Sequence, residues 1–167
     1  LRSKNNNRVG LQISLYQNNK INIHFWFDGL ELRDEVSKKL KYDIAIDIQG
    51  DFPFVDPKNI SRLIKFHLSN NFDIVVPSSP ISEKDAKLKD VVKLVSTNDN
   101  KVVYFSRSII PNPYKEKPKF YLKHMSIISF SKKSLEVFSK LNEGSIEKYE
   151  GIELMRALEN NLRVGTF

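Results

Sequence analysis

The chain has 167 residues, of which 40% are hydrophobic and 28% charged, with a formal net charge of +7 and no cysteine. This composition is that of a globular domain with a real core; it excludes a disulfide framework, and no apolar run is long enough to cross a membrane. Since there is also no signal peptide, we expect a cytoplasmic protein. The positive charge favours an anionic substrate, and without a nucleic-acid motif we expect no nucleic-acid partner. The densest basic run, Lys115–Lys123, is typical of a solvated face.

The first elements are not all decided by their pattern. Apolar residues in Arg8–Tyr16 alternate as in a strand, yet their spacing also fits one face of a helix, so both structures stay open. Ile21–Phe27 is rich in β-branched and aromatic residues, which predicts a strand. Apolar residues at four-residue spacing predict an amphipathic helix over Leu30–Leu40.

The next stretch is the one around which we expect the fold to be organised. Ile44–Ile48 is an apolar run of strand length that breaks at Gln49-Gly50-Asp51. Asp56 is placed as the N-cap, and Pro57 as the first residue, of a following helix. A carboxylate at the end of such a strand can bind Mg²⁺ together with substrate phosphates, whereas the alternative is that Gly50-Asp51 is only a turn.

Strands and helices continue to alternate through the rest of the chain. The predicted elements are a helix over Pro57–Ser69, a strand over Asp73–Pro77, a hairpin of Val91–Val95 and Lys101–Phe105, a strand over Tyr121–Phe130, a helix over Ser131–Leu141, a long helix from Ser145, and a strand over Arg163–Phe167. The expected apolar faces are Ile60, Leu63, Ile64 and Leu68 on the first of these helices, and Ile146, Tyr149, Ile152, Met155 and Leu158 on the long one. We therefore expect an α/β fold with a mixed, mostly parallel sheet flanked by helices and an inserted hairpin.

Several segments, in this order and spacing, together resemble one known family. They are Gln49-Gly-Asp51, Val91–Val95, Tyr104-Phe-Ser-Arg-Ser-Ile-Ile-Pro111, Leu122–Phe130 and Gly144–Glu159. From about Tyr42 to Phe167 the chain is similar to the CMP-Kdo synthetases (3-deoxy-manno-octulosonate cytidylyltransferases). The resemblance implies a fold of the nucleotide-diphospho-sugar transferase type, often a homodimer. It also implies transfer of CMP from CTP to the anomeric hydroxyl of a sugar acid, with Mg²⁺, for lipopolysaccharide assembly.

The resemblance also implies roles for individual residues. Asp51 and Arg107 would be catalytic: Asp51 would bind Mg²⁺, and Arg107 would pair with anionic groups of the substrate. Gln49, His124 and Glu153 would contact the sugar acid.

Gly29 and Glu31 match the family's nucleotide-binding segment less closely than the residues above match their motifs. Gly29 and Glu31 would correspond to residues that help hold the nucleotide. Glu147 and Glu150 lie on the predicted long helix near Lys148, and for both we expect a solvated face.

The chain departs from the family pattern at several places. Phe52, Ile128 and Leu154 stand where the family has Glu, Tyr and Gln, which should change the sugar that fits. The family's N-terminal phosphate loop and second metal-binding Asp find no match, so we expect one cytidylyltransferase-like domain over 1–167 that is incomplete at both ends. The alternatives are a non-catalytic nucleotide- or sugar-binding remnant of this fold and a cytidylyltransferase for a sialic-acid-like sugar. Because the family has a helix before its second strand, the resemblance favours a helix over Arg8–Tyr16.

Overall fold

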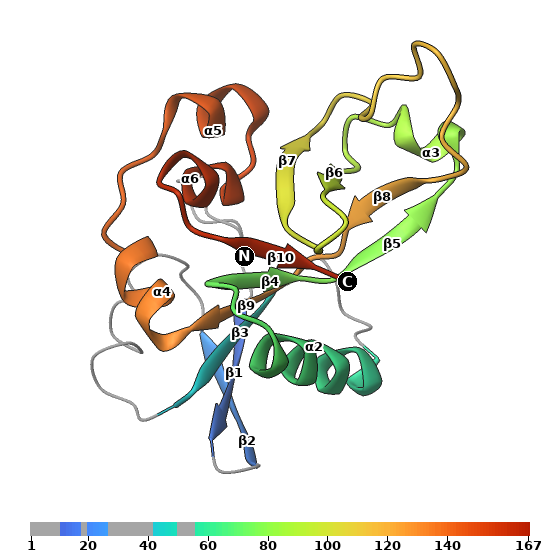
Figure 1. The fold of residues 1–167 in the computed structure, drawn as a ribbon. Coiled ribbons are helices and arrows are strands. Elements are labelled where there is room, and N and C mark those ends of the chain that lie inside the picture. Colours follow the sequence, from blue (N-terminus) through green and yellow to red (C-terminus); the bar gives the residue numbers. More distant parts are fainter. Residues whose placement is uncertain (1–10, 18–19, 27–41, 50–55) are drawn as a thin grey trace. The chain divides into compact units, whose positions relative to one another are not determined.

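The structure, a computed structural model, describes residues 11–17, 20–26, 42–49 and 56–167. Its residues group into two compact units: unit 1, Leu1–Val75 with Ser126–Leu141, and unit 2, Val76–Met125 with Asn142–Phe167. Figure 1 shows the elements of both units, which are described separately below. The single domain expected over the whole chain stays a prediction.

Unit 1 is built on a sheet whose neighbouring strands follow the order β4-β9-β3-β1-β2 (Figure 1). These strands are β1 (Leu11–Gln17), β2 (Lys20–Trp26), β3 (Ile44–Gln49), β4 (Ile74–Val76) and β9 (Ile127–Ser131). The apolar run predicted as the central strand is β3, and Ala45 and Ile46 on it are both buried. Since consecutive residues of a strand point to opposite faces, β3 is covered on both sides.

The strand directions correct the expectation of a mostly parallel sheet. Every register described for the two units is antiparallel. The alternation of strand, helix and strand in Ile44–Val76 does bring β3 and β4 into the same direction, because both pair antiparallel with β9. However, β9 lies between them and comes from a segment some distance along the chain. Local alternation predicts the crossover but contains no information about a later strand inserted into it.

The N-terminal segment corrects a second expectation. A helix was favoured over Arg8–Tyr16, but Leu11–Gln17 is the strand β1. It pairs with β2 on one side and with β3 on the other. The apolar spacing of this segment fits both the alternation of a strand and the repeat of a helix. Pairing with two neighbouring strands therefore decided the structure.

Two helices of unit 1 begin at the predicted caps. Helix α2 spans Pro57–Ser69, as predicted, and the Asp56 carboxylate accepts the Lys58 N–H at 2.9 Å. Helix α4 spans Lys132–Phe138, and the Ser131 hydroxyl accepts the Ser134 N–H at 3.1 Å. These side chains satisfy N–H groups that have no partner within the helix.

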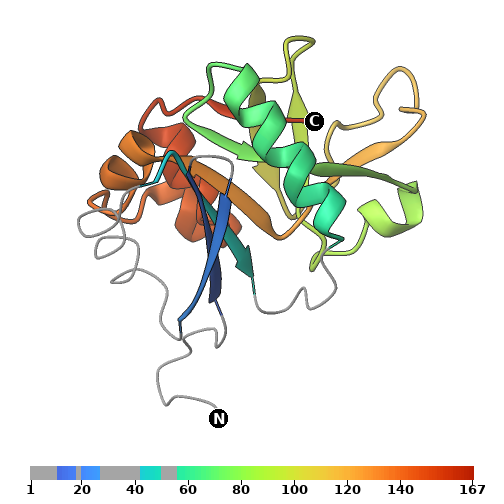
Figure 2. The same cartoon turned by 90° about the horizontal axis from the view of Figure 1, so that it is seen from below.

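The two helices cover opposite faces of the sheet, as the side chains of β9 show. The Phe130 ring lies 5.4 Å from that of Phe138 on α4, between ring centroids, whereas Ser129 donates its hydroxyl to Nδ1 of His67 on α2 at 2.7 Å. Neighbouring strand residues point to opposite faces, so α4 lies over one face and α2 over the other (Figures 1 and 2). The expected apolar face of α2 is partly wrong, because Leu68 is 54% exposed and His67 is buried instead.

Unit 2 contains a four-stranded antiparallel sheet in the order β5-β8-β6-β7. Its elements are β5 (Ser78–Ile81), α3 (Glu83–Ala86), β6 (Lys93–Ser96), β7 (Val102–Ser106), β8 (Tyr121–His124), α5 (Ser145–Glu150), α6 (Leu154–Glu159) and β10 (Val164–Thr166). The predicted hairpin is confirmed as β6 and β7, and β10 confirms the last predicted strand, whereas β5 and α3 were not predicted.

The strand expected over Tyr121–Phe130 is divided between the two units. Its first part, β8, pairs with β5 and β6, whereas its second part, β9, pairs with β3 and β4. Between them, the Met125 N–H donates to the Pro77 carbonyl at 3.0 Å. A continuous apolar run does not reveal that the strand changes partners, so the sequence predicted one strand.

The long helix expected from Ser145 is also two helices. Helix α5 ends at Glu150, the next residue, Gly151, has φ +60°, and α6 begins at Leu154. A left-handed residue after a helix ends it, and glycine adopts that conformation without the penalty of a Cβ. Tyr149, which was expected on the apolar face, is instead 86% exposed.

No helix in the described residues is both long and apolar enough to cross a membrane. The helix predicted over Leu30–Leu40 lies outside the described residues.

Candidate functional site

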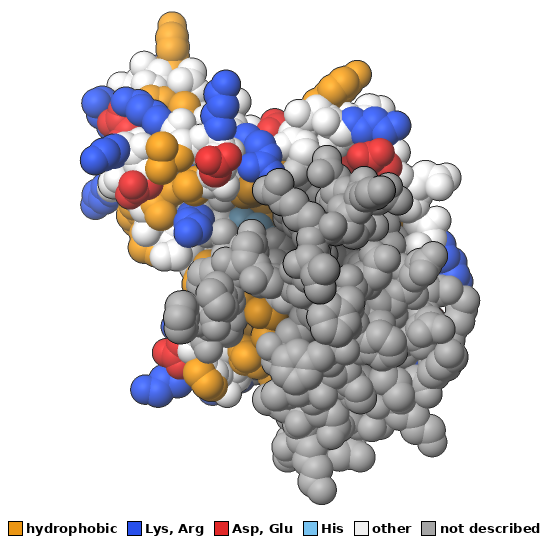
Figure 3. Space-filling model, turned by 180° about the vertical axis from the view of Figure 1, so that it is seen from behind, with side chains coloured by type: hydrophobic (Ala, Val, Ile, Leu, Met, Phe, Trp, Pro, Cys, Tyr) orange, Lys and Arg blue, Asp and Glu red, His pale blue; other side chains and the backbone are white. Residues whose placement is uncertain are grey.

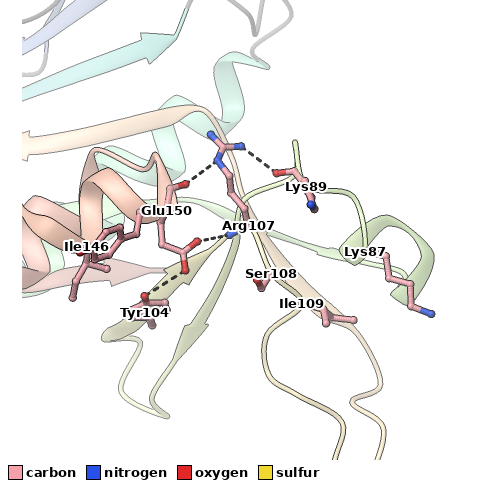
Figure 4. A pocket seen from close by; sticks show the side chains of 9 residues that line it. Lys87, Lys89, Tyr104, Arg107, Ser108, Ile109, Ile146 and Glu150 are labelled. Atoms are coloured by element: carbon pink, nitrogen blue, oxygen red, sulfur yellow. Dashed lines mark hydrogen bonds between the residues drawn. The ribbon is translucent and has the colours of Figure 1, made fainter.

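A pocket of about 600 Å³ opens in unit 2 where the end of β7 meets α5 (Figure 4). It is lined by Lys87, Lys89, Tyr104, Arg107, Ser108, Ile109, Ile146, Tyr149 and Glu150. Three cationic side chains and one carboxylate are among these residues. Such an excess of positive charge in a hollow attracts an anionic ligand.

Arg107 directly follows β7, and its guanidinium is held by carbonyl groups. Nε donates to the Glu150 carbonyl at 2.9 Å, one terminal nitrogen to the Gly151 carbonyl at 3.1 Å, and the other to the Lys89 carbonyl at 3.1 Å. The first two carbonyls lie at the C-terminal end of α5, where the helix dipole favours a cation. Arg107 therefore joins β7 to α5 and also forms part of the pocket wall.

Glu150 approaches Arg107 from α5, which corrects the expectation of a solvated face. Its carboxylate accepts the Arg107 N–H at 3.0 Å and, more weakly, the Tyr104 hydroxyl at 3.4 Å (Figure 4). It also accepts the Ser106 hydroxyl at 2.9 Å. Partial burial and then the Glu150 charge raise the pKa of Tyr104. The carboxylate thus replaces missing backbone partners at the end of β7.

Lys93 on β6 is fully buried beside this site. Its ammonium donates to the carbonyls of Leu88 at 3.0 Å, Val91 at 2.7 Å and Arg107 at 2.5 Å. Burial and then the Arg107 charge lower the pKa of Lys93, whereas Glu150 acts in the opposite direction. All three ammonium protons are thereby bound to backbone oxygens.

Glu147, the other glutamate expected on a solvated face, is also buried. It forms a two-point ion pair with Arg156 on α6, with 2.7 Å between Nε and Oε2 and 2.5 Å between the second nitrogen and Oε1. Each of the two residues is only 6% exposed. The spacing of Glu147 and Lys148 suggested an exposed face, but the break at Gly151 brings α6 against α5, and Lys148 alone stays exposed.

His124, predicted to contact the sugar acid, ends β8 in unit 2. Its ring meets that of Phe105 edge-on, with 5.9 Å between centroids, and its Nδ1 is buried without a hydrogen-bond partner among the described residues. Burial, and secondarily the Lys123 charge, lower the pKa of His124 to about 4. His124 is therefore neutral at pH 7 and keeps a nitrogen available for a hydrogen bond.

The other predicted site residues are less fully described. Glu153 is partly buried and lies directly before α6 in unit 2. Gln49 is the last residue of β3 in unit 1. Asp51, Gly29 and Glu31 lie outside the described residues. Unit 2 therefore holds Arg107, His124 and Glu153, and only the first of these lines the pocket.

The described residues contain no group of three or more His, Cys, Asp or Glu side chains that could hold a metal ion. Magnesium was predicted at Asp51. In the sequence, this residue lies two positions after Gln49, the last residue of β3. The metal site and the roles of the predicted residues accordingly stay predictions.

Sequence reasoning missed the residues that surround Arg107, above all Lys93, Ser106 and Lys89. One signal was present: Lys93 interrupts the apolar run Val91–Val95, and a charged residue in such a run is seldom left without a special partner. Nothing in the local sequence marks Ser106 as a partner of Glu150.

Other basic side chains lie on the surface, as Figure 3 shows for the described part of one face. Within the predicted basic run, Lys115, Lys117 and Lys119 are exposed. Lys117 pairs with Glu83 at 3.3 Å. This agrees with the solvated face expected for the run.

Comparison with known proteins places the chain in a family. A family model described as cytidylyltransferase matches residues 28–164. The chain is 35% identical over 121 residues to 3-deoxy-manno-octulosonate cytidylyltransferase of Rickettsia canadensis (strain McKiel), and 36% identical over 121 residues to that of Rickettsia rickettsii (strain Sheila Smith). Each match covers 72% of this chain and 48% of the relative. The chain thus spans about half the length of the curated relatives it matches.

A solved structure agrees with this result. The structure of CMP:2-keto-3-deoxy-manno-octonic acid synthetase complexed with CTP is similar with a TM-score of 0.78 and 30% sequence identity, over 84% of this chain and 58% of that one. The resemblance inferred from the sequence motifs is confirmed, as is an α/β fold. With a family model matched from residue 28 to residue 164, this chain belongs to the cytidylyltransferase family.

Proposed function

We propose that this protein transfers CMP from CTP to the anomeric hydroxyl of Kdo or a related sugar acid and releases pyrophosphate. The observation that carries the proposal is the position of Arg107. The segment Tyr104–Arg107, on which the family resemblance depends, ends in a pocket with an excess of positive charge. A guanidinium in such a pocket suits the carboxylate of a sugar acid.

The proposed contribution of the described residues is to bind and orient the sugar acid. Arg107 would pair with its carboxylate, and the buried nitrogen of neutral His124 would form a hydrogen bond with a hydroxyl. Glu153 and Gln49 would accept from further hydroxyls. Holding the anomeric oxygen in one place relative to the nucleotide lowers the entropic part of the barrier.

Magnesium belongs to the proposal through Asp51. When bound, the ion would neutralise charge on the triphosphate of CTP. A carboxylate next to the end of a strand is suited to a hard cation, which prefers oxygen ligands. Gly29 and Glu31 would help hold the nucleotide.

The cellular setting is proposed on the same basis. By the resemblance to the CMP-Kdo synthetases, the protein would act in lipopolysaccharide biosynthesis, in the cytoplasm and as a homodimer.

A second candidate, a non-catalytic nucleotide- or sugar-binding protein, is favoured by two buried side chains. Ile128 and Leu154, which stand at family positions with polar side chains, are 2% and 3% exposed. Neither can offer a hydrogen bond to a sugar. The same observation favours an altered sugar preference, including a sialic-acid-like substrate, within the first candidate.

A pyrophosphate-release assay with CTP, Mg²⁺ and a panel of sugar acids tests the proposal. We expect release with Kdo or a related acid, and Asp51→Asn should abolish most of it. Asp43→Asn is the matched control, because Asp43 is an exposed carboxylate just before β3. Calorimetric binding of CTP, with no pyrophosphate released from CTP in the presence of any of the acids, would instead support the non-catalytic candidate. An active Asp51→Asn variant would refute the metal role.

A further inference from the structure

Arg107 is held by two charged residues that the proposed function leaves without a role, Lys93 and Glu150. They act on opposite sides of its backbone: the Lys93 ammonium binds the Arg107 carbonyl at 2.5 Å, and the Glu150 carboxylate binds the Arg107 N–H at 3.0 Å. Both ends of the residue are therefore fixed to side chains rather than to a neighbouring strand.

Lys93 also fixes a second part of the pocket wall. Two of its protons go to the carbonyls of Leu88 and Val91, which close the turn that contains Lys89. The Lys89 carbonyl in turn accepts from the Arg107 guanidinium at 3.1 Å. Because all three ammonium protons are used, Lys93 has none left for a ligand and can act only through its neighbours.

Glu150 contributes through its backbone as well as its side chain. Its carbonyl accepts the Arg107 Nε–H at 2.9 Å, and the next carbonyl, of Gly151, accepts from a terminal nitrogen at 3.1 Å. A guanidinium has five N–H groups, and the three contacts to Glu150, Gly151 and Lys89 use three of them. Two N–H groups, one on each terminal nitrogen, find no partner among the described residues, and Arg107 lines the pocket.

We propose that Lys93 and Glu150 are positioning residues that hold Arg107 with its two uncommitted N–H groups available to the carboxylate of the sugar acid. The inference rests on the proposed function for the identity of that ligand. Its physical basis is preorganisation: a free arginine side chain has large rotamer freedom, and fixing it before binding lowers the entropy lost when the ligand arrives. A fully buried ammonium whose partners are all carbonyls is costly, and an apolar residue would fill the same space without that cost.

The test compares Glu150→Gln, Glu150→Ala and Lys93→Met in the full chain, with CTP and Kdo as substrates. We expect the KM for Kdo to rise about tenfold or more for Lys93→Met and Glu150→Ala, and less for Glu150→Gln, which keeps one acceptor oxygen. The KM for CTP should stay within about twofold of wild type. Glu143→Gln is the matched control, because Glu143 is exposed and lies 4.0 Å from Lys148.

A second measurement follows Arg107 without relying on activity. The Nε–H resonance of Arg107 is assigned by its loss in Arg107→Lys, and its exchange with water is measured by NMR. We expect slow exchange in wild type and faster exchange in Glu150→Ala and Lys93→Met. Urea unfolding identifies any variant that fails to fold, and Glu150→Gln, at a partly buried residue, then carries the test.

The outcomes separate the two proposals. Folded variants with unchanged Nε–H exchange, or with faster exchange but an unchanged KM for Kdo, overturn the positioning role. If wild-type protein releases no pyrophosphate with any sugar acid, the proposed function fails. Unchanged exchange would then overturn the positioning role as well, whereas faster exchange with weaker calorimetric binding of Kdo would support it.

Discussion

Two arginine–glutamate arrangements start from the same short helix, α5, and differ in what their charges face. Glu147 and Arg156 pair with each other at two points, and both are buried. Glu150 and Arg107 instead bind mostly backbone groups and hydroxyls, and both line a pocket. The first arrangement is closed, since its charges satisfy each other, whereas in the second, two guanidinium N–H groups have no partner within the described part of the chain.

One helix can therefore support both stability and binding. A closed buried pair is most costly to break, because the remaining charge stays in a low-dielectric environment. An open arrangement is partly exposed, so its loss should affect ligand binding more than folding.

Breaking the closed pair should have the largest effect. Arg156→Met is expected to lower the free energy of unfolding by about 3–5 kcal/mol, because it leaves the Glu147 carboxylate buried without its partner. Urea unfolding measures the change. The double variant Glu147→Met/Arg156→Met should regain most of the loss; a double variant as unstable as the single one would contradict this account of the pair.

Changing the open arrangement should act on binding. Arg107→Lys keeps the charge but removes the fork of donors, and we expect the KM for the sugar acid to rise about 10- to 100-fold. The loss of unfolding free energy should be clearly smaller than for Arg156→Met. Arg163→Lys, at an exposed arginine, serves as the control in steady-state kinetics. An unchanged KM would remove Arg107 from the binding site.

Lowering the pH should act on a third group of unit 2, His124. Its pKa is lowered from 6.5 to about 4 in the folded state, so below pH 6.5 the unfolded chain binds a proton that the folded chain does not. Stability that is fully present above pH 6.5 is therefore lost as the pH falls toward 4, by up to about 2 kcal/mol at pH 5.

Urea unfolding at pH 7.5 and pH 5 checks this expectation. His124→Gln should weaken the pH dependence but not remove it, because burial also lowers the pKa of His67 in unit 1. An identical pH dependence in wild type and His124→Gln would show that His124 does not carry the effect.

A change at the helix break should have a moderate effect on both arrangements. Gly151→Ala places a Cβ at φ +60°, which costs about 1–2 kcal/mol. The new Cβ would lie 3.7 Å from Arg107 Nε, an ordinary contact, so strain in the backbone and not a clash is the expected cause. Gly151→Asn should cost less, since asparagine tolerates this conformation better. Thermal unfolding of the two variants compares them, and equal losses would point to a clash.

The exposed pair of Lys148 on α5 and Glu143, which precedes that helix, should contribute least. Lys148 lies 4.0 Å from Glu143, and both side chains are more than half exposed. Lys148→Gln is expected to change the free energy of unfolding by less than about 0.5 kcal/mol. A larger loss of unfolding free energy would mean that this ion pair stabilises the protein more than its exposure predicts.

Features with a local physical cause could be predicted from the sequence. The bounds of α2 follow from Asp56 and Pro57, because an N-cap and an N1 proline act within one turn. The cap at Ser131 was predicted for the same reason, and the β6–β7 hairpin from two β-rich runs joined by a short polar turn. The family resemblance was also present in the sequence, since Tyr104–Arg107 and Gly144–Glu159 keep the family's residues in order.

Features that depend on a distant partner could not be predicted. The strand over Tyr121–Phe130 is divided because its two halves pair in different units, and β1 is a strand because β2 and β3 lie on either side. Glu147 and Glu150 were expected on a solvated face, although Gly151 was a visible signal for the helix break.

The sequence alone thus determined where α2 and α4 begin, where β3 and the β6–β7 hairpin lie, and which family the chain resembles. The helix starts and the strands depend on residues a few positions apart. Only the tertiary structure decided which strands pair, which charges are buried and which residues surround Arg107. Those contacts join β6, β7 and α5 across many residues of intervening chain. Hydrophobic periodicity records that a residue is buried, but it carries no record of the residue against which it packs.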